Sequence, residues 1–232
     1  MAEPANLKPA ELAEHHILQR ILSGEYAAGT NLPSERELAV DLQVTRPTLR
    51  EVLQRLARDG WLDIRHGRST RIRSFLQEGS LAVLSTLVEK TEVFPENLVD
   101  QTLQIRLLVA PAYTRQAIMN AFEEVEKALK PFAEGSDDPT VLAGMDYQIQ
   151  KHLAALSGNN ILTLIMNNLE LLYTKALTVV YQDAEARKQT RVYFKMIYKA
   201  ARANEPDAAE AVTRRVMNEC SQLWKVTSTR EV

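Results

Sequence analysis

The chain has 232 residues, of which 45% are hydrophobic and 25% charged, and its formal net charge at pH 7 is −2. This composition is typical of a soluble globular protein of one or two domains, and no apolar run reaches the roughly 18 residues that a membrane-spanning helix needs. A single cysteine, Cys220, excludes an internal disulfide and a cysteine-cluster metal site. The N-terminus lacks the pattern of a signal peptide, so we expect a cytoplasmic protein without a membrane partner.

The N-terminal part of the chain carries start and stop signals for short helices. Apolar residues at helical spacing predict a first helix that stops at Gly24. Ser34, with Glu37 three residues later, has the pattern of a capping box, in which side chain and backbone cap each other. This pattern predicts a second helix that ends near Leu42.

A third predicted helix separates an apolar face from a polar N-terminal end. Thr45 is suited to cap it, Pro47 lies in its first turn, where a missing N–H costs little, and Gly60 closes it after about Asp59. Four apolar residues at i, i+3, i+4 and i+7 form a stripe that must pack on the first two helices: Leu49, Val52, Leu53 and Leu56.

After this helix, the stretches WLDIR and RSTRIR flank the dipeptide HG, a two-residue link of the kind found in tight hairpins. Three helices followed by a hairpin are typical of a winged helix-turn-helix. We therefore predict a mainly α fold with an N-terminal winged helix-turn-helix (1–75), a linker helix (76–90) and a C-terminal all-helical domain (91–232).

Positive charge is concentrated at the end of the first predicted domain. Residues 46–73 hold eight arginines and three acidic residues, a local net charge of +5, so the rest of the chain carries −7. In a winged helix-turn-helix, the N-terminal end of the third helix reaches base edges in the major groove, where arginine contacts O6 and N7 of guanine. Arginines on an exposed helix face are often only solvated, but their combination with the capping box, the apolar stripe and the hairpin favours DNA binding. We predict that Arg46 and Arg50 read bases.

Polar residues next to these arginines suit the DNA backbone. The hydroxyl groups of Thr45 and Thr48 lie at a helix N-terminus, whose free N–H groups attract phosphate oxygens. The HG dipeptide would form the tip of the wing and approach the minor groove, with Arg68 and Arg71 supplying charge.

The stretch LPSERELAVDLQVTRPTLREVLQRLARDGWLDIRHGRSTRI resembles the DNA-binding domain of the GntR family of regulators, and TLREVLQRLARDGWL followed by HG is especially similar to its FadR subfamily. The resemblance implies operator contacts by seven residues: Arg36, Thr45, Arg46, Thr48, Arg50, His66 and Gly67. Pro47 departs from the threonine expected at its position in the subfamily.

The C-terminal part reads as a helical bundle. Long helical patterns over 76–232 are separated by loop signals at TEVFPEN, EGSDDPT, SGNN and ANEPD, which predict about six or seven helices. The stretch ILTLIMNNLELLYTKALTVVY is apolar nearly all round, as expected for a helix inside a bundle. The phrases MDYQIQKHLAALSGNNIL and RRVMNECSQLW resemble the effector domain of the FadR subfamily.

Many proteins with a related effector domain bind a metal ion through one aspartate and three histidines. Alignment on the two phrases places Asp146, Gln150, Phe194 and Asn218 at those positions. Because the three imidazole ligands are missing, we predict no metal and no other cofactor.

The FadR subfamily implies a long-chain acyl-CoA effector. Met217, Cys220 and Trp224 share one face of the last predicted helix and are candidates to line an acyl tunnel, although periodicity alone favours a plain core stripe. Arg106 lies in an apolar helix, near the ligand cavity by resemblance. A buried arginine needs an anionic partner, either Asp146 or the phosphates of the ligand.

The resemblance implies a homodimeric transcription regulator of fatty-acid metabolism that binds a pseudo-palindromic operator and is released by acyl-CoA. The alternative is a GntR-family regulator with another effector, such as a small organic acid. An enzyme is not expected, because 76–232 contains no histidine–carboxylate pair, nucleophile elbow or phosphate-binding glycine loop.

Overall fold

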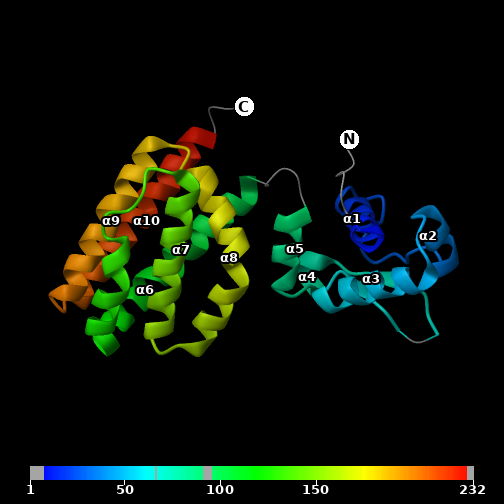
Figure 1. Cartoon of the computed structure of the whole chain (residues 1–232), viewed down its shortest axis with the longest axis horizontal. Helices are drawn as coiled ribbons and strands as arrows, with labels where there is room; N and C mark the ends of the chain where they lie inside the picture. The colour runs from blue at the N-terminus through cyan, green and yellow to red at the C-terminus, as the bar shows by residue number, and fades with distance from the viewer. Residues whose placement is uncertain (1–7, 66, 91–95, 229–232) are drawn as a thin grey trace. The chain divides into compact units, whose positions relative to one another are not determined.

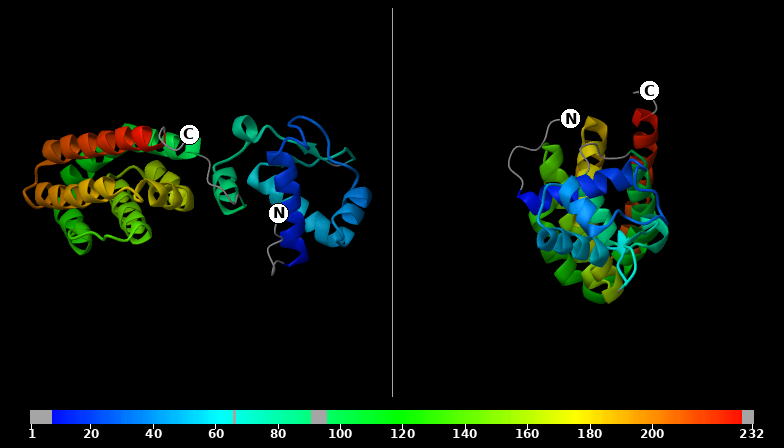
Figure 2. Two further views of the ribbon diagram at one scale, coloured as in Figure 1. Left: turned by 90° about the horizontal axis from the view of Figure 1, so that it is seen from above. Right: turned by 90° about the vertical axis from the view of Figure 1, so that its right-hand side faces the viewer.

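The computed structural model describes residues 8–65, 67–90 and 96–228, and the chain divides into two compact units, Met1–Lys90 and Thr91–Val232 (Figures 1 and 2). The fold is mainly helical. No helix in the described ranges is both long and apolar enough to cross a membrane.

The first unit is a winged helix-turn-helix followed by two short helices. In chain order its elements are α1 (Pro9–Leu22), α2 (Glu35–Asp41), α3 (Arg46–Asp59), β1 (Leu62–Asp63), β2 (Arg71–Ile72), α4 (Phe75–Glu78) and α5 (Ala82–Lys90).

The predicted helix signals of this unit are confirmed. The backbone N–H of Ser34 donates to the Glu37 carboxylate at 3.0 Å and the Ser34 hydroxyl accepts from the Glu37 N–H, which completes the capping box of α2. Thr45 caps α3, and Gly60 ends it with a left-handed φ of +103°. The stripe predicted on α3 is the centre of the core, since each of its four residues is at most 3% exposed. Full burial of such side chains contributes about 1.5–3 kcal/mol each.

The wing differs from the predicted tight hairpin. The described pairing of β1 with β2 joins Leu62 to Ile72 and Asp63 to Arg71, so the connection between paired residues covers 64–70 rather than two residues. A third segment was not predicted: Leu32 N–H donates to the Thr70 carbonyl and Ile72 N–H donates to the Thr30 carbonyl, both at 2.8 Å. The segment before α2 therefore supports the wing from its other side.

The end of α3 lies against the turn that leads into α5. A Cβ atom on Gly60 would come within 3.0 Å of the Ser80 backbone nitrogen and within 3.1 Å of the Gly79 Cα, so only glycine fits there. The Ser80 hydroxyl donates to the Asp59 carbonyl at 3.2 Å. Further along, α5 contributes Val83 and Leu87 to the same hydrophobic core as the α3 stripe. The segment expected to be a linker helix is thus packed on the first unit.

The second unit is a helical bundle around one long helix, which is kinked at Ala121. It contains α6 (Glu96–Leu129), the 3-10 turn η1 (Lys130–Phe132), α7 (Pro139–Leu156), α8 (Asn160–Val180), α9 (Ala184–Arg202) and α10 (Pro206–Ser228). α6 contacts each of the four other α-helices, which pair as α7 with α8 and α9 with α10 (Figure 1). The six or seven helices predicted over 76–232 correspond to α5–α10.

One expectation for this bundle is wrong. The apolar sequence of α8 suggested a helix buried on all sides, but α8 packs mainly on α7 and leaves Ile161 and Leu164 64% and 58% exposed. Apolar composition alone did not distinguish a central helix from a peripheral one.

Candidate nucleic-acid interface and effector site

The N-terminal end of α3 presents two hydroxyl groups and free backbone donors. The hydroxyl of Thr45 accepts from the Thr48 N–H at 3.3 Å and lies 2.8 Å from the Thr48 hydroxyl. Thr45 is exposed and Thr48 half-buried. The two hydroxyls are therefore held together at a helix N-terminus, where an anion is stabilised by the helix dipole.

The three arginines predicted to contact the operator lie on α2 and α3, and all three are exposed. Arg36 and Arg46 make no hydrogen bond or ion pair with the residues that the structure describes. Arg50 differs, because its Nε donates to the Glu35 carboxylate at 2.7 Å. Arg36 and Arg46 thus have guanidinium groups available for DNA, and Arg50 has both Nη atoms available.

Of the predicted wing tip, His66 lies outside the described residues. Gly67 is exposed and has a left-handed φ of +72°, and nothing lies within 4 Å of a Cβ placed on it. The glycine is therefore required by its backbone conformation and not by crowding.

Several arginines of the basic stretch are neutralised within the unit. Arg55 pairs with Glu14 and Arg65 pairs with Asp63, each at 2.9 Å. Arg71, expected to supply charge to DNA, instead donates from both Nη atoms to Glu78 in α4, and the shorter contact is 2.5 Å. We revise its role to fastening the wing.

The same contact changes the titration of its acidic partner. The Arg71 hydrogen bond, together with the Ser74 backbone N–H, lowers the pKa of Glu78 to about 2. The pair therefore stays ionised over the whole neutral range.

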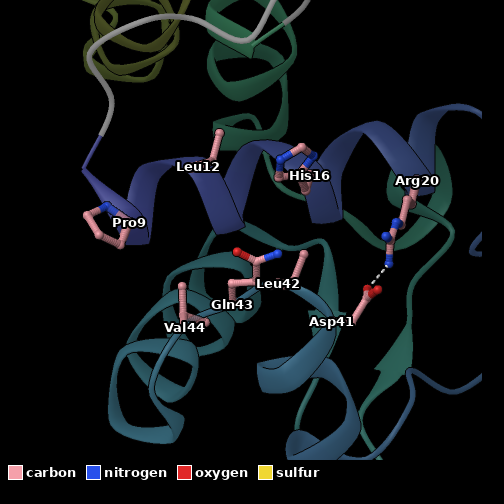
Figure 3. A pocket seen from close by; sticks show the side chains of 8 residues that line it. All are labelled: Pro9, Leu12, His16, Arg20, Asp41, Leu42, Gln43 and Val44. Atoms are coloured by element: carbon pink, nitrogen blue, oxygen red, sulfur yellow. Dashed lines mark hydrogen bonds and ion pairs between the residues drawn. The ribbon is translucent and has the colours of Figure 1, made fainter.

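A cavity of about 350 Å³ opens between α1 and the turn from α2 to α3 (Figure 3). Pro9, Leu12 and His16 of α1 face Leu42, Gln43 and Val44 across it, and an ion pair between Arg20 and Asp41 closes one end. None of the residues predicted to contact DNA or effector lines this cavity.

A buried polar cluster lies inside the second unit. The Arg106 guanidinium of α6 donates from Nη2 to the Asp146 carboxylate of α7 at 2.5 Å, and the two side chains are 6% and 0% exposed. The ion-pair interpretation of Arg106 is thereby confirmed. Its Nε and Nη1 atoms are buried without a hydrogen-bond partner, and its Cζ lies 5.0 Å from the centre of the Tyr173 ring.

The cluster connects α6 to α7, to α9 and to the end of α8. Tyr181, the residue after α8, donates to Asp146 at 2.6 Å, and the Gln150 amide donates to the same carboxylate at 3.1 Å. Gln150 also donates to the Tyr193 hydroxyl of α9 at 3.2 Å and accepts from the Tyr113 hydroxyl of α6 at 2.8 Å.

Burial and charge determine the protonation of the cluster. Burial disfavours the charged form of Arg106, but the charge of Asp146 and the neighbouring tyrosines raise its pKa above the ordinary value, so the guanidinium stays charged. Burial raises the pKa of Tyr181 and of Tyr113 well above the usual value, so their hydroxyls remain protonated donors.

The four positions aligned with metal ligands do not form a metal-binding site. Asp146 and Gln150 belong to the polar cluster, Phe194 is 1% exposed within the hydrophobic core, and Asn218 is on the exposed side of α10. In the described parts of the chain no group of three histidine, cysteine, aspartate or glutamate side chains is placed to hold a metal ion.

The α10 face predicted to line an effector tunnel packs against the bundle. Met217 and Cys220 are each 2% exposed, and Trp224 is partly buried against the same core. Burial raises the pKa of the Cys220 thiol, and the positive charge of Arg106 acts in the opposite direction. The structure thus brings Cys220 near the polar cluster and leaves Met217 in the apolar core.

The tyrosines of the cluster were missed by sequence reasoning. Tyr113, Tyr181 and Tyr193 are buried and each uses its hydroxyl in a hydrogen bond. Three tyrosines at buried positions of separate amphipathic helices would have been a usable signal, because a buried tyrosine hydroxyl usually needs a polar partner.

Two family models match the chain. The model described as bacterial regulatory proteins, gntR family, matches residues 9–72, and the model described as FadR C-terminal domain matches residues 73–230. Among solved structures, that of Lar, which controls the expression of the Listeria monocytogenes agr system, covers 95% of this chain and 98% of its own with a TM-score of 0.63. At 13% identity this likeness shows the fold alone.

Curated relatives cover most of the chain. The fatty acid metabolism regulator protein of Shewanella pealeana is 43% identical over 194 residues, which are 83% of this chain and 81% of that protein. The protein of the same name from Escherichia fergusonii is 35% identical over 216 residues, 93% of this chain and 90% of its own. The chain therefore belongs to the gntR family of bacterial regulatory proteins, with a FadR C-terminal domain behind its DNA-binding domain, and it is a DNA-binding transcription regulator and not an enzyme.

Proposed function

We propose that this regulator acts in the cytoplasm on genes of fatty-acid metabolism, binds a pseudo-palindromic operator as a homodimer, and is released by long-chain acyl-CoA. The relatives named as fatty acid metabolism regulators support the class of target genes. On the DNA side, Arg36 and Arg46 are exposed and have no ion pair among the described residues, which supports base contacts. The paired hydroxyls of Thr45 and Thr48 at the N-terminal end of α3 support phosphate contacts.

The proposal of an acyl-CoA effector depends on one observation: two nitrogens of the buried Arg106 side chain, Nε and Nη1, have no hydrogen-bond partner. A buried guanidinium with two unpartnered nitrogens is costly, so the site favours a ligand that supplies acceptor oxygens. The thioester and phosphates of an acyl-CoA offer such oxygens, and its apolar chain suits the Met217 and Trp224 face of α10.

An acyl chain entering there separates packed helices. Met217 and Cys220 are buried between α10 and the rest of the bundle, and α10 packs on both α6 and α9. Ligand binding therefore stabilises an arrangement with α10 displaced. A ligand that prefers one arrangement by a few kcal/mol shifts the population by a factor of tens to hundreds, which is sufficient to lower operator affinity.

The homodimer is supported by one face of α6. Ile105, Leu108 and Met119 are 50%, 71% and 52% exposed along it, and Ala112 lies between them. From residue 101 to residue 120 the charged residue on this face is Arg115, which Asp207 neutralises at 2.7 Å. A two-fold interface brings each patch against its own copy, so an apolar face without net charge is well suited to it.

We propose no metal and no cofactor. The Asp146 carboxylate already accepts three hydrogen bonds, from Arg106, Tyr181 and Gln150, which occupy the oxygens that a metal ion would need. A small organic acid remains the second candidate effector, because its carboxylate would also give Arg106 the acceptors that it lacks.

The test begins by selecting tight-binding duplexes from a randomised DNA library. Anisotropy of a selected duplex is then followed while oleoyl-CoA, coenzyme A or succinate is added, with calorimetry in parallel. Release by oleoyl-CoA alone supports the proposal, and release by succinate alone supports the organic acid. Arg46→Ala is expected to weaken operator binding by about 1–3 kcal/mol, and unchanged binding would remove α3 as the reading helix.

A separate measurement tests the dimer. Sedimentation of the wild type should give a dimer, and Leu108→Asp should shift it to monomer, because the substitution places two like charges next to the two-fold axis. Leu164→Asp, on the exposed part of α8, makes the same chemical change at a position that is 58% exposed; it is the matched control and should leave the dimer intact. A dimer that survives Leu108→Asp would exclude this face.

A further inference from the structure

Of the two arginines predicted to read bases, Arg50 is the one that forms an ion pair with another described side chain. Its Nε donates to the Glu35 carboxylate at 2.7 Å, which joins α3 to the first residue of α2. The side chains of Arg50 and Glu35 are 65% and 36% exposed. Arg46, on the same helix, has no ion pair with any described residue.

Stability does not explain this contact. An ion pair so exposed contributes little to folding, since water screens it and both long side chains lose conformational freedom. A carboxylate at the DNA-facing end of α2 also repels phosphates and so opposes general affinity for DNA. Neither folding stability nor general affinity for DNA therefore accounts for a glutamate at this position.

The atoms that the pair leaves free point to another role. Glu35 engages Nε of Arg50, while Nη1 and Nη2 have no partner among the described residues. These two nitrogens can donate in parallel to O6 and N7 of a guanine. An arginine that is already held on its Nε side loses less conformational freedom when it forms such a contact.

We propose that Glu35 is a positioning residue for sequence recognition: it holds the Arg50 guanidinium with its two Nη atoms free for one guanine. The inference rests on the proposed role of α3 as the reading helix. Glu35 then has two opposite effects on DNA binding. Its negative charge lowers the affinity for any DNA, and its contact with Arg50 raises the discrimination at one base pair.

The test uses the full chain, a selected operator duplex, variants of that duplex with one base pair changed at a time, and an unrelated duplex. Arg50→Ala first identifies the base pair at which discrimination is lost. Glu35→Ala is then expected to lose roughly tenfold discrimination at that same base pair and to bind the unrelated duplex at least as tightly as the wild type does.

The matched control is Glu51→Ala. Glu51 is an exposed acid of α3 next to Arg50 in sequence, and it makes no ion pair with the described residues. Its removal also takes one negative charge from this pair of helices but leaves the Arg50 contact intact, so discrimination should be unchanged. In the double variant Glu35→Ala/Arg50→Ala, discrimination should be no lower than in Arg50→Ala, because the two substitutions remove one interaction.

Three outcomes would overturn the inference: unchanged discrimination in Glu35→Ala, an equal loss in Glu51→Ala, or a loss at a base pair different from the one that Arg50 reads. A structural role for Glu35 in α2 would weaken binding to all duplexes by the same factor, which this design detects. If Arg46→Ala and Arg50→Ala both leave operator binding unchanged, the proposed function of α3 fails, and that result is distinct from the failure of Glu35 alone.

Discussion

Neutralising Asp146 isolates the energetic role of the buried ion pair in the second unit. Asp146→Asn keeps the shape of the side chain and an acceptor oxygen, but it removes the charge that faces Arg106 at 2.5 Å. The arginine already lacks partners for Nε and Nη1, and a guanidinium cannot become neutral by losing a proton. Because one partner of a buried pair is left uncompensated, we expect a loss of about 3–5 kcal/mol in the free energy of unfolding.

Replacing the other partner of the pair, Arg106, is expected to lower the free energy of unfolding by a smaller amount. In Arg106→Met the Asp146 carboxylate keeps the hydrogen bonds from Tyr181 and Gln150, at 2.6 Å and 3.1 Å. Hydrogen bonds to a charged group contribute about 1.5–3 kcal/mol each, so the carboxylate stays partly solvated. The double variant Arg106→Met/Asp146→Leu removes both charges and should unfold within about 1 kcal/mol of the wild type, or be more stable.

The two tryptophans of the chain allow a clean assay, since Trp61 lies in the first unit and Trp224 in the second. In a Trp61→Phe background, urea unfolding followed by fluorescence reports Trp224 alone. A cost below about 1 kcal/mol for Asp146→Asn, or a larger cost for Arg106→Met than for Asp146→Asn, would refute the assignment of Arg106 as the poorly solvated partner.

Three further predictions concern single side chains. The pKa of Glu78 is about 2 in the folded protein, below the ordinary 4.5, so Glu78 stabilises the first unit above pH 4.5 and loses this effect as the pH falls towards 2. The melting temperatures of the wild type and of Glu78→Gln should therefore converge as the pH falls over that range. A constant difference between the two melting temperatures would contradict the Arg71 contact. Thr45→Ala removes the cap of α3 and should cost about 0.5–2 kcal/mol in urea unfolding of the first unit, whereas Thr45→Ser should retain most of it, and equal losses would show that the hydroxyl does not cap. Burial and a raised pKa should make Cys220 react slowly with a thiol reagent until urea unfolds the second unit, and rapid labelling of the native protein would contradict its burial.

The first unit could be predicted closely because its signals are local. A cap at Ser34, a cap at Thr45 and a stop at Gly60 act within one helical turn, so sequence spacing determines them. The wing was predicted less well. Its loop of residues 64–70 and its pairing with the segment before α2 depend on contacts between positions about 40 residues apart, which no local pattern specifies.

The sequence did not predict which charged residues pair with one another. The surplus of arginine over 46–73 is real, but Glu14, Glu35 and Glu78 lie outside that stretch and pair with three of its arginines. In the second unit, Arg106 and Asp146 are 40 residues apart, and sequence reasoning could name their pairing only as one of two alternatives. Long-range ion pairs depend on tertiary packing, and tertiary packing is what a single sequence shows least.

The close approach of Gly60 to Gly79 and Ser80 has a consequence for how a signal enters the DNA-binding unit. The covalent path from the helical bundle reaches this unit at the end of α5, and α5 shares its core with α3 through Val83 and Leu87. The C-terminal end of α3 is in close contact with the turn before α5, and no free space separates them. Within the first unit, a displacement of α5 therefore has to displace α3 as well, and with it the hydroxyl groups at the N-terminal end of α3.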